Sequence, residues 1–227
     1  MVAPAQKLGT GLYTIPEAAM YARIPTQTLS RWVFGAEEGA RVVRPEYQGE
    51  KFLTFVDFIQ ALAIRAIRIH WKIPLQKIRE AVHRAEDEFG FDYPLARKHL
   101  IFLFNGEILI RTDEKQPPVQ ISGRGHHQQT LKQLVEPYMH DISFDAASGL
   151  AVKYEAFRYG DEVIRMDPKQ HLGEPFFEGT GYSPRVLWEA VETEGSVEAA
   201  AKAYGVSEQQ VEVAFRYLDH LELKSAA

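Results

Sequence analysis

Apolar residues recur at helical spacing through most of the first hundred residues. In the segment from Tyr13 to Gly35 they predict two short helices separated by Pro25. Thr14 has the position of an N-cap, and Glu17 follows it at the spacing of a capping box. The second helix is predicted over residues 26–34 and ends at Gly35, because glycine readily adopts the left-handed conformation that terminates helices.

Two longer helices are predicted next. Thr54 and Asp57 form a second capping pattern, and Pro74 precedes a helix over residues 75–89. The apolar stripe expected on the first of these helices consists of Phe55, Phe58, Ile59, Leu62, Ala66 and Ile69. Upstream, the apolar pairs Val42-Val43 and Phe52-Leu53 flank the turn-rich PEYQGE, which predicts a β-hairpin.

The pattern becomes β-like after residue 99. LIFLFNGEILIR, residues 100–111, predicts a hairpin with Asn105-Gly106 as its two-residue turn. The other expected elements of this middle part are a loop over 113–129, a short helix over 129–139, and strands in DISFD, LAVKYEAFRY and VIRMDP. Helices return after Ser183, with Ser196 and the Ser207 to Gln210 capping pattern starting the last two.

We therefore expect a mainly α chain with small β elements, of the α+β class. The predicted domains are a helical N-terminal domain (1–98), a β-rich connecting or dimerisation region (99–160) and a C-terminal helical domain (161–227).

A helical motif occurs twice, at an offset of 182 residues. The shared pattern is an apolar residue, an Ala-Ala pair, a second apolar residue, a helix breaker and a third apolar residue. The matched positions are Ile15/Val197, Ala18/Ala200, Ala19/Ala201, Ile24/Val206, Pro25/Ser207 and Leu29/Val211. Small residues that let two helices approach, followed by a sharp turn and an apolar anchor, are what a helix-turn-helix requires.

Charge distinguishes the two copies. Residues 1–84 contain 12 Lys and Arg against 7 Asp and Glu, a net charge of +5, whereas the remainder has 14 against 24, a net charge of −10. Hydroxyl and amide groups can read base edges, and cations hold phosphates. The DNA-contact residues predicted on and behind the first copy are Thr26, Gln27, Thr28, Ser30, Arg31, Arg41, Arg44 and Lys51. Glu208 and Glu212 in the second copy would repel phosphates, so that copy is expected to pack against protein.

Residues 12–98 resemble the winged helix of MerR-like regulators and, more closely, the N-terminal domain of VapB-type antitoxins. The C-terminal part, residues 160–221, looks like the domain of unknown function 433. The motifs that match are Asp167-Pro168, Gly173-Glu174-Pro175, Gly179-Thr180 and Gly195-Ser196. The arginine that usually follows Gly-Thr in that family is Gly181 here, so its role does not carry over.

The resemblance implies an antitoxin of a type II toxin–antitoxin system, which neutralises a PIN-like ribonuclease toxin and represses its own operon as a DNA-binding homodimer. PIN-like nucleases cluster carboxylates around metal ions, so an antitoxin could place a cation there. The resulting candidates for toxin contact, around the segment EPFFEGTGYS, are Arg165, Lys169, Phe176, Phe177 and Arg185. One of the two phenylalanines is expected in the core and the other exposed.

Three alternatives stay open. The N-terminal fold could serve protein contact alone, the C-terminal domain could only dimerise the chain, and the protein could be a stand-alone MerR-like regulator with a sensory C-terminal part. The chain lacks cysteine, phosphate-loop motifs and a compact set of metal ligands, so we predict no enzyme activity, cofactor or metal. Without a signal peptide or apolar span, a cytoplasmic protein with no membrane contact is expected.

Overall fold

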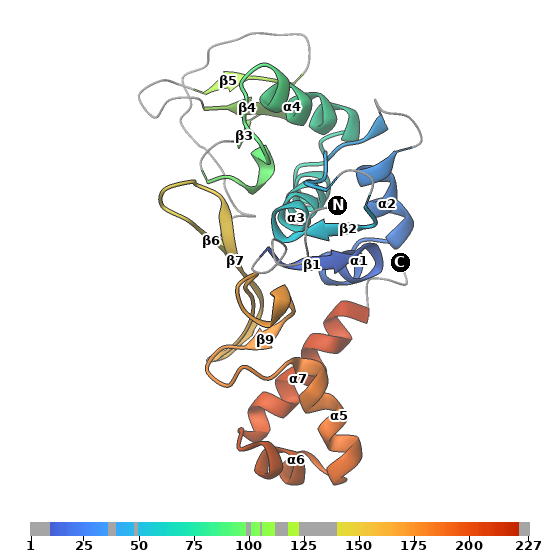
Figure 1. The fold of residues 1–227 in the computed structure, drawn as a ribbon, viewed down its shortest axis with the longest axis vertical. Helices are drawn as coiled ribbons and strands as arrows, with labels where there is room; N and C mark the ends of the chain where they lie inside the picture. Colours follow the sequence, from blue (N-terminus) through green and yellow to red (C-terminus); the bar gives the residue numbers. More distant parts are fainter. Residues whose placement is uncertain are drawn as a thin grey trace.

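The computed structural model describes residues 10–35, 40–47, 50–98, 101–104, 106–111, 118–122 and 140–222. In these ranges the chain forms seven α-helices and three small antiparallel sheets (Figure 1), which confirms the predicted α+β class. The short helix and most of the loop expected between residues 113 and 139 lie outside the described residues. None of the described helices combines the length and apolar character needed to cross a membrane.

The N-terminal part is built around one long helix. The helices in this part are α1 (Ile15–Ala22), α2 (Thr26–Phe34), α3 (Phe55–His70) and α4 (Leu75–Asp87). The expected caps form: the Thr54 hydroxyl accepts from the Asp57 backbone N–H, and Asp57 Oδ2 accepts from the Thr54 N–H at 3.0 Å. The apolar stripe predicted on α3 is only partly correct, because Ile69 is 55% exposed while Ala63, Ile64 and Ile67 are buried.

The predicted hairpin between Val42-Val43 and Phe52-Leu53 is wrong. Phe52 belongs to strand β2 (Phe52–Thr54), which pairs instead with β1 (Leu12–Thr14), a strand that the sequence did not reveal. Both valines are buried outside any strand, and their backbone N–H groups donate to the Trp32 carbonyl at 2.7 and 3.2 Å. Their amides are therefore satisfied by α2, so they need no partner strand.

The hairpin predicted around Asn105-Gly106 is confirmed. Strands β3 (Ile101–Phe104) and β4 (Glu107–Ile110) pair antiparallel, and β5 (Val119–Gln120) extends the sheet along β4. This sheet lies beside α4 at the top of Figure 1. Lys77 on α4 forms an ion pair with Glu107 at 2.5 Å, which ties the sheet to the helix.

A four-stranded sheet connects the two helical parts. Its order is β6 (Ile142–Phe144), β7 (Ala151–Tyr159), β8 (Glu162–Met166) and β9 (Phe176–Phe177), all antiparallel. Met166 belongs to the large N-terminal core, whereas Ile164 belongs to a smaller core under the C-terminal helices. Strand β7 lies before residue 160 and strand β8 after it, and the two pair in this sheet. The domain boundary expected after residue 160 stays a prediction.

The C-terminal helices form the other end of the molecule, at the bottom of Figure 1. They are α5 (Pro184–Glu194), α6 (Val197–Tyr204) and α7 (Glu208–Glu222), and their predicted caps at Ser183, Ser196 and Ser207 all form. Tyr21 on α1 packs against the core of this end, and two polar contacts also join it to the N-terminal part. The Tyr13 hydroxyl donates to the Gly173 carbonyl at 2.8 Å, and the Arg23 guanidinium contacts the His220 ring near the end of α7.

Candidate nucleic-acid interface

The first helical pair begins with a closed capping box. The Glu17 carboxylate accepts from the Thr14 backbone N–H at 2.7 Å, and the Thr14 hydroxyl accepts from the Glu17 N–H at 3.4 Å. Helix α1 ends at Arg23, whose φ of 53° reverses the chain, and the Ile24 N–H donates to the Ala19 carbonyl at 2.9 Å. Because Ala18 is fully buried and small, α2 can pack closely across α1.

The second helical pair repeats this geometry at the same offset. Gly205, 182 residues after Arg23, has a φ of 66°, and the Val206 N–H donates to the Ala201 carbonyl at 3.0 Å. Ala200 is fully buried, as its counterpart in the first pair is. Helix α7 also starts 182 residues after α2. The repeat read from the sequence is therefore a repeat in structure.

Helix α2 presents a polar face to solvent. Leu29, Trp32 and Val33 are its buried side chains. Of the residues predicted to contact DNA, Thr26, Gln27 and Arg31 are exposed, and Thr28 and Ser30 are half-buried. An amide, a guanidinium and a hydroxyl thus stand on one accessible helix, which is the chemistry that reading base edges and holding phosphates requires.

The three cations of the following segment differ in their surroundings. Arg41 is half-buried and its Nε donates to the Phe34 carbonyl at 3.0 Å, so it closes the end of α2. Arg44 forms a bidentate pair with Asp87 on α4, at 2.6 and 3.0 Å, and lies 3.0 Å from Glu86. Lys51 is exposed. The structure therefore brings Arg41 and Lys51 beside α2, whereas Arg44 is held by two carboxylates that sequence reasoning did not connect with it.

The surroundings of Glu86 and Asp87 shift their pKa values in opposite directions. Burial raises the pKa of Glu86 from an ordinary value of 4.5 to about 7, although the Arg44 guanidinium opposes the rise. Hydrogen bonds from Arg44 lower the pKa of Asp87, which stays ionised. A phosphate would have to compete with Asp87 for Arg44, so this residue is a weaker candidate for DNA contact than Arg31.

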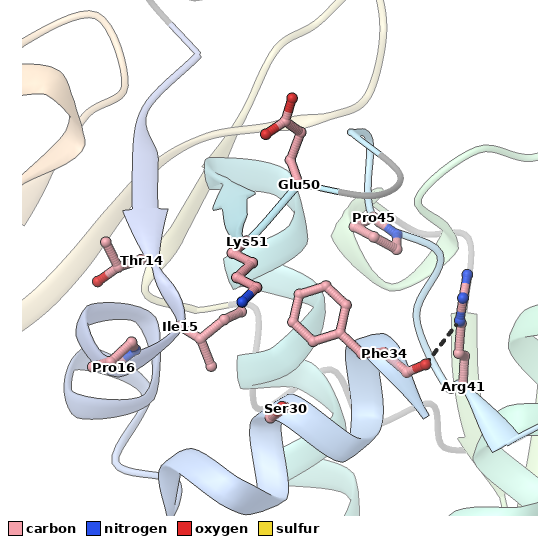
Figure 2. Close-up of a pocket in the computed structure, with 9 residues that line it drawn as sticks. All are labelled: Thr14, Ile15, Pro16, Ser30, Phe34, Arg41, Pro45, Glu50 and Lys51. Atoms are coloured by element: carbon pink, nitrogen blue, oxygen red, sulfur yellow. Dashed lines mark hydrogen bonds between the residues drawn. The ribbon is translucent and has the colours of Figure 1, made fainter. Parts of the chain in front are cut away.

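A cavity of about 460 Å³ lies between the start of α1, the last turn of α2 and the segment that leads to β2. Figure 2 shows its lining, which consists of Thr14, Ile15, Pro16, Ser30, Phe34, Arg41, Pro45, Glu50 and Lys51. Three of the predicted DNA-contact residues, Ser30, Arg41 and Lys51, share this cavity. Sequence patterns did not reveal it, because its walls come from three separate segments.

The second pair differs from the first at the position of Arg31, while its Glu208, Gln209 and Glu212 are exposed. Val213 on α7 occupies the position of Arg31 on α2 and is fully buried, within the core that includes Phe177 and Leu187. Near the start of α7, the Gln210 side chain donates to Glu162 on β8 at 2.9 Å. At this position α7 packs into the chain's own core, and contact of the second copy with another protein stays a prediction.

The segment EPFFEGTGYS is a strand and a turn. Phe176 and Phe177 form β9, which pairs with β8, and their exposed fractions are 5% and 0%. The expectation that one phenylalanine faces outward is therefore wrong. Strand pairing holds the first ring against His171, at a centroid distance of 4.7 Å, while the second enters the C-terminal core. As folded here, neither ring is available to a partner.

The three cations near this segment are unequal candidates. Arg165 lies on β8 and forms an ion pair with Glu178 at 2.5 Å. Lys169 has an exposed side chain. Arg185, on the first turn of α5, has a side chain that is 79% exposed and lies 3.3 Å from Glu189. Lys169 and Arg185 are thus the two predicted partner contacts that the folded chain leaves accessible.

Comparison with known proteins adds three likenesses. Residues 164–218 match the family described as "Protein of unknown function (DUF433)". The chain is 29% identical over 221 residues to "Putative antitoxin VapB45" of Mycobacterium tuberculosis, covering 88% of this chain and 90% of that protein. It is also 22% identical over 227 residues to "Uncharacterized protein Rv2308" of the same organism, covering 91% and 89% of the two chains.

One solved structure shares the fold. The crystal structure of Rv2018 from Mycobacterium tuberculosis superposes with a TM-score of 0.61, at 22% sequence identity, over 89% of this chain and 96% of that chain. At this identity the likeness concerns the fold alone.

Proposed function

We propose that this protein is an antitoxin, which neutralises a PIN-like ribonuclease toxin and represses its own operon by binding DNA as a homodimer. The observation that carries the proposal is the similarity to the protein named as a VapB45 antitoxin, which extends over about nine tenths of both chains. A DNA-binding part and a partner-binding part are therefore proposed together for this chain.

The exposed face of α2 supports the DNA-binding part of the proposal. Gln27 and Arg31 stand on a helix that is buried on its opposite side, as the reading helix of a helix-turn-helix is. The second pair lacks this chemistry, because Glu208 and Glu212 are exposed on α7. DNA contact is therefore assigned to α2, and toxin contact to the surface around Lys169 and Arg185.

Growth rescue tests the antitoxin proposal. The product of the adjacent reading frame is expressed in a bacterial host with and without this protein, and we expect toxicity that co-expression relieves, with the two proteins co-purifying. A Lys169→Ala, Arg185→Ala variant should rescue less well, whereas Lys202→Ala, at an exposed position on α6, is the matched control. A neighbouring product that is not toxic, or a toxic one that does not bind this protein, would contradict the proposal.

A further inference from the structure

The cavity beside α2 has the size of a small-molecule site. We propose that it binds a small organic monocarboxylate with a flat apolar body, such as an aromatic acid. Its volume of about 460 Å³ falls within the range of roughly 300–1,000 Å³ that is usual for ligand pockets. This inference does not rest on the proposed function, because it concerns a ligand rather than DNA or a toxin.

The walls of the cavity suit a flat apolar body. Ile15 and Pro45 are buried and line it, and Pro16 and the half-buried Phe34 complete the apolar part of the lining. Figure 2 shows the Phe34 ring facing the cavity from the last turn of α2. Aromatic and proline rings make favourable contact with planar ligands, and their burial supplies most of the binding free energy in such pockets.

The cations of the cavity suit a single negative charge. Figure 2 shows the Lys51 ammonium between Ile15 and Phe34, and within the described ranges no ion pair or hydrogen bond engages it. Arg41 uses its Nε for the Phe34 carbonyl, and among the described residues its two terminal nitrogens form no hydrogen bond or ion pair. The Glu50 carboxylate, which points away from the other residues in Figure 2, reduces the local charge to +1. One carboxylate balances this charge, whereas a phosphate dianion would exceed it.

Occupation of the cavity would affect the face of α2. Ser30, Arg41 and Lys51 line the cavity and also belong to the predicted DNA contacts. A carboxylate held by the Lys51 ammonium would cancel the attraction of this cation for a phosphate backbone. A ligand of this class would therefore compete with DNA for the same groups.

Nuclear magnetic resonance can test ligand binding directly on the full-length protein. Isoleucine methyl groups are labelled with carbon-13, and benzoate is titrated against its uncharged analogue benzamide, with the Ile15 signal assigned through an Ile15→Val variant. We expect benzoate to shift the Ile15 methyl signal saturably, while Ile69 on the exposed end of α3 stays unchanged. Benzamide should bind at least about fivefold more weakly, because it lacks the charge that Lys51 and Arg41 attract.

A matched pair of variants tests the role of the cation. Lys51→Met keeps the apolar stem and removes the charge, and it should weaken benzoate binding at least about fivefold. Lys202→Met, on α6 and far from the cavity, should leave benzoate binding unchanged. Equal shifts from benzoate and benzamide, equal affinities in the two variants, or no saturable shift at Ile15 would each overturn the proposal.

Discussion

The two helical pairs of this protein have nearly the same backbone but differ in what packs against the second helix of each pair. Both begin with a capped eight-residue helix, turn through a residue of positive φ and start the second helix after three residues. Arg31 on α2 is exposed, whereas Val213, the equivalent residue on α7, is buried. The shared motif thus determines how the two helices cross, and the neighbouring elements determine which face is left for a partner.

The cause of the difference is what packs on the second helix. Helix α7 lies against α5 and α6, and the strands β8 and β9 complete its core through Ile164 and Phe177. Helix α2 contacts α1 and the segment around Val42 and Val43, which leaves one side open. The same supersecondary unit therefore leaves Arg31 exposed in one place and buries the equivalent Val213 in the other.

Substitutions at the equivalent residues Arg31 and Val213 should give the largest difference in the free energy of unfolding between the two pairs. Val213→Arg buries a charge without a partner and overfills the core, so we expect it to lower the free energy of unfolding by about 3–5 kcal/mol. Arg31→Val, at an exposed position, should change it by less than about 0.5 kcal/mol. Urea unfolding followed by circular dichroism measures both values, and similar losses in the two variants would show that the pairs are not packed differently.

Burial of the Glu86 carboxyl, which lies beside Arg44, predicts a pH dependence of stability in the N-terminal part. Since the pKa of Glu86 is raised in the folded state to about 7, the folded chain binds more protons than the unfolded chain, and its stability falls as pH rises from 4.5 towards 7. Glu86→Gln should remove a fall on the order of 2 kcal/mol over this range. Thermal unfolding at several pH values measures it, and identical pH profiles of the variant and the wild type would contradict the burial of this carboxyl.

Substitutions at the turn residues Arg23 and Gly205 should give the smallest difference in stability between the two pairs. Gly205 has a φ of 66° with no atom near the position of an added Cβ, so Gly205→Ala should cost about 1 kcal/mol through backbone strain alone. Arg23 already has this strain, so Arg23→Ala should lose only its contact with His220, about 0.5 kcal/mol. Thermal unfolding of both variants distinguishes these values, and a larger loss for Arg23→Ala would reverse the comparison.

The local parts of the fold were predictable from the sequence. The caps at Thr14, Thr54 and Ser207 depend on residues three positions apart, so a short pattern contains all the information that they need. The repeat was visible for the same reason. It combines a local helix pattern with a turn, and it recurs at one fixed offset.

The failures concern contacts between distant segments. Strand β2 pairs with β1, about forty residues upstream, and Arg44 is held by Asp87, which lies 43 residues further on. Phe176 is buried because β9 pairs with β8 and His171 covers its ring. None of these partners follows from residue spacing, since each pairing is selected by the packing of the complete fold.

The central claim is that α2 and not α7 contacts DNA, and equivalent glutamines test it. Gln27 on α2 and Gln209 on α7 are separated by the repeat offset and both are exposed. Fluorescence anisotropy on the DNA upstream of the protein's own reading frame gives the affinity of each alanine variant at several salt concentrations. We expect Gln27→Ala to weaken binding about tenfold, as loss of a base contact does, and Gln209→Ala to leave it unchanged. An unchanged affinity in Gln27→Ala, or an equal loss in Gln209→Ala, would contradict the claim.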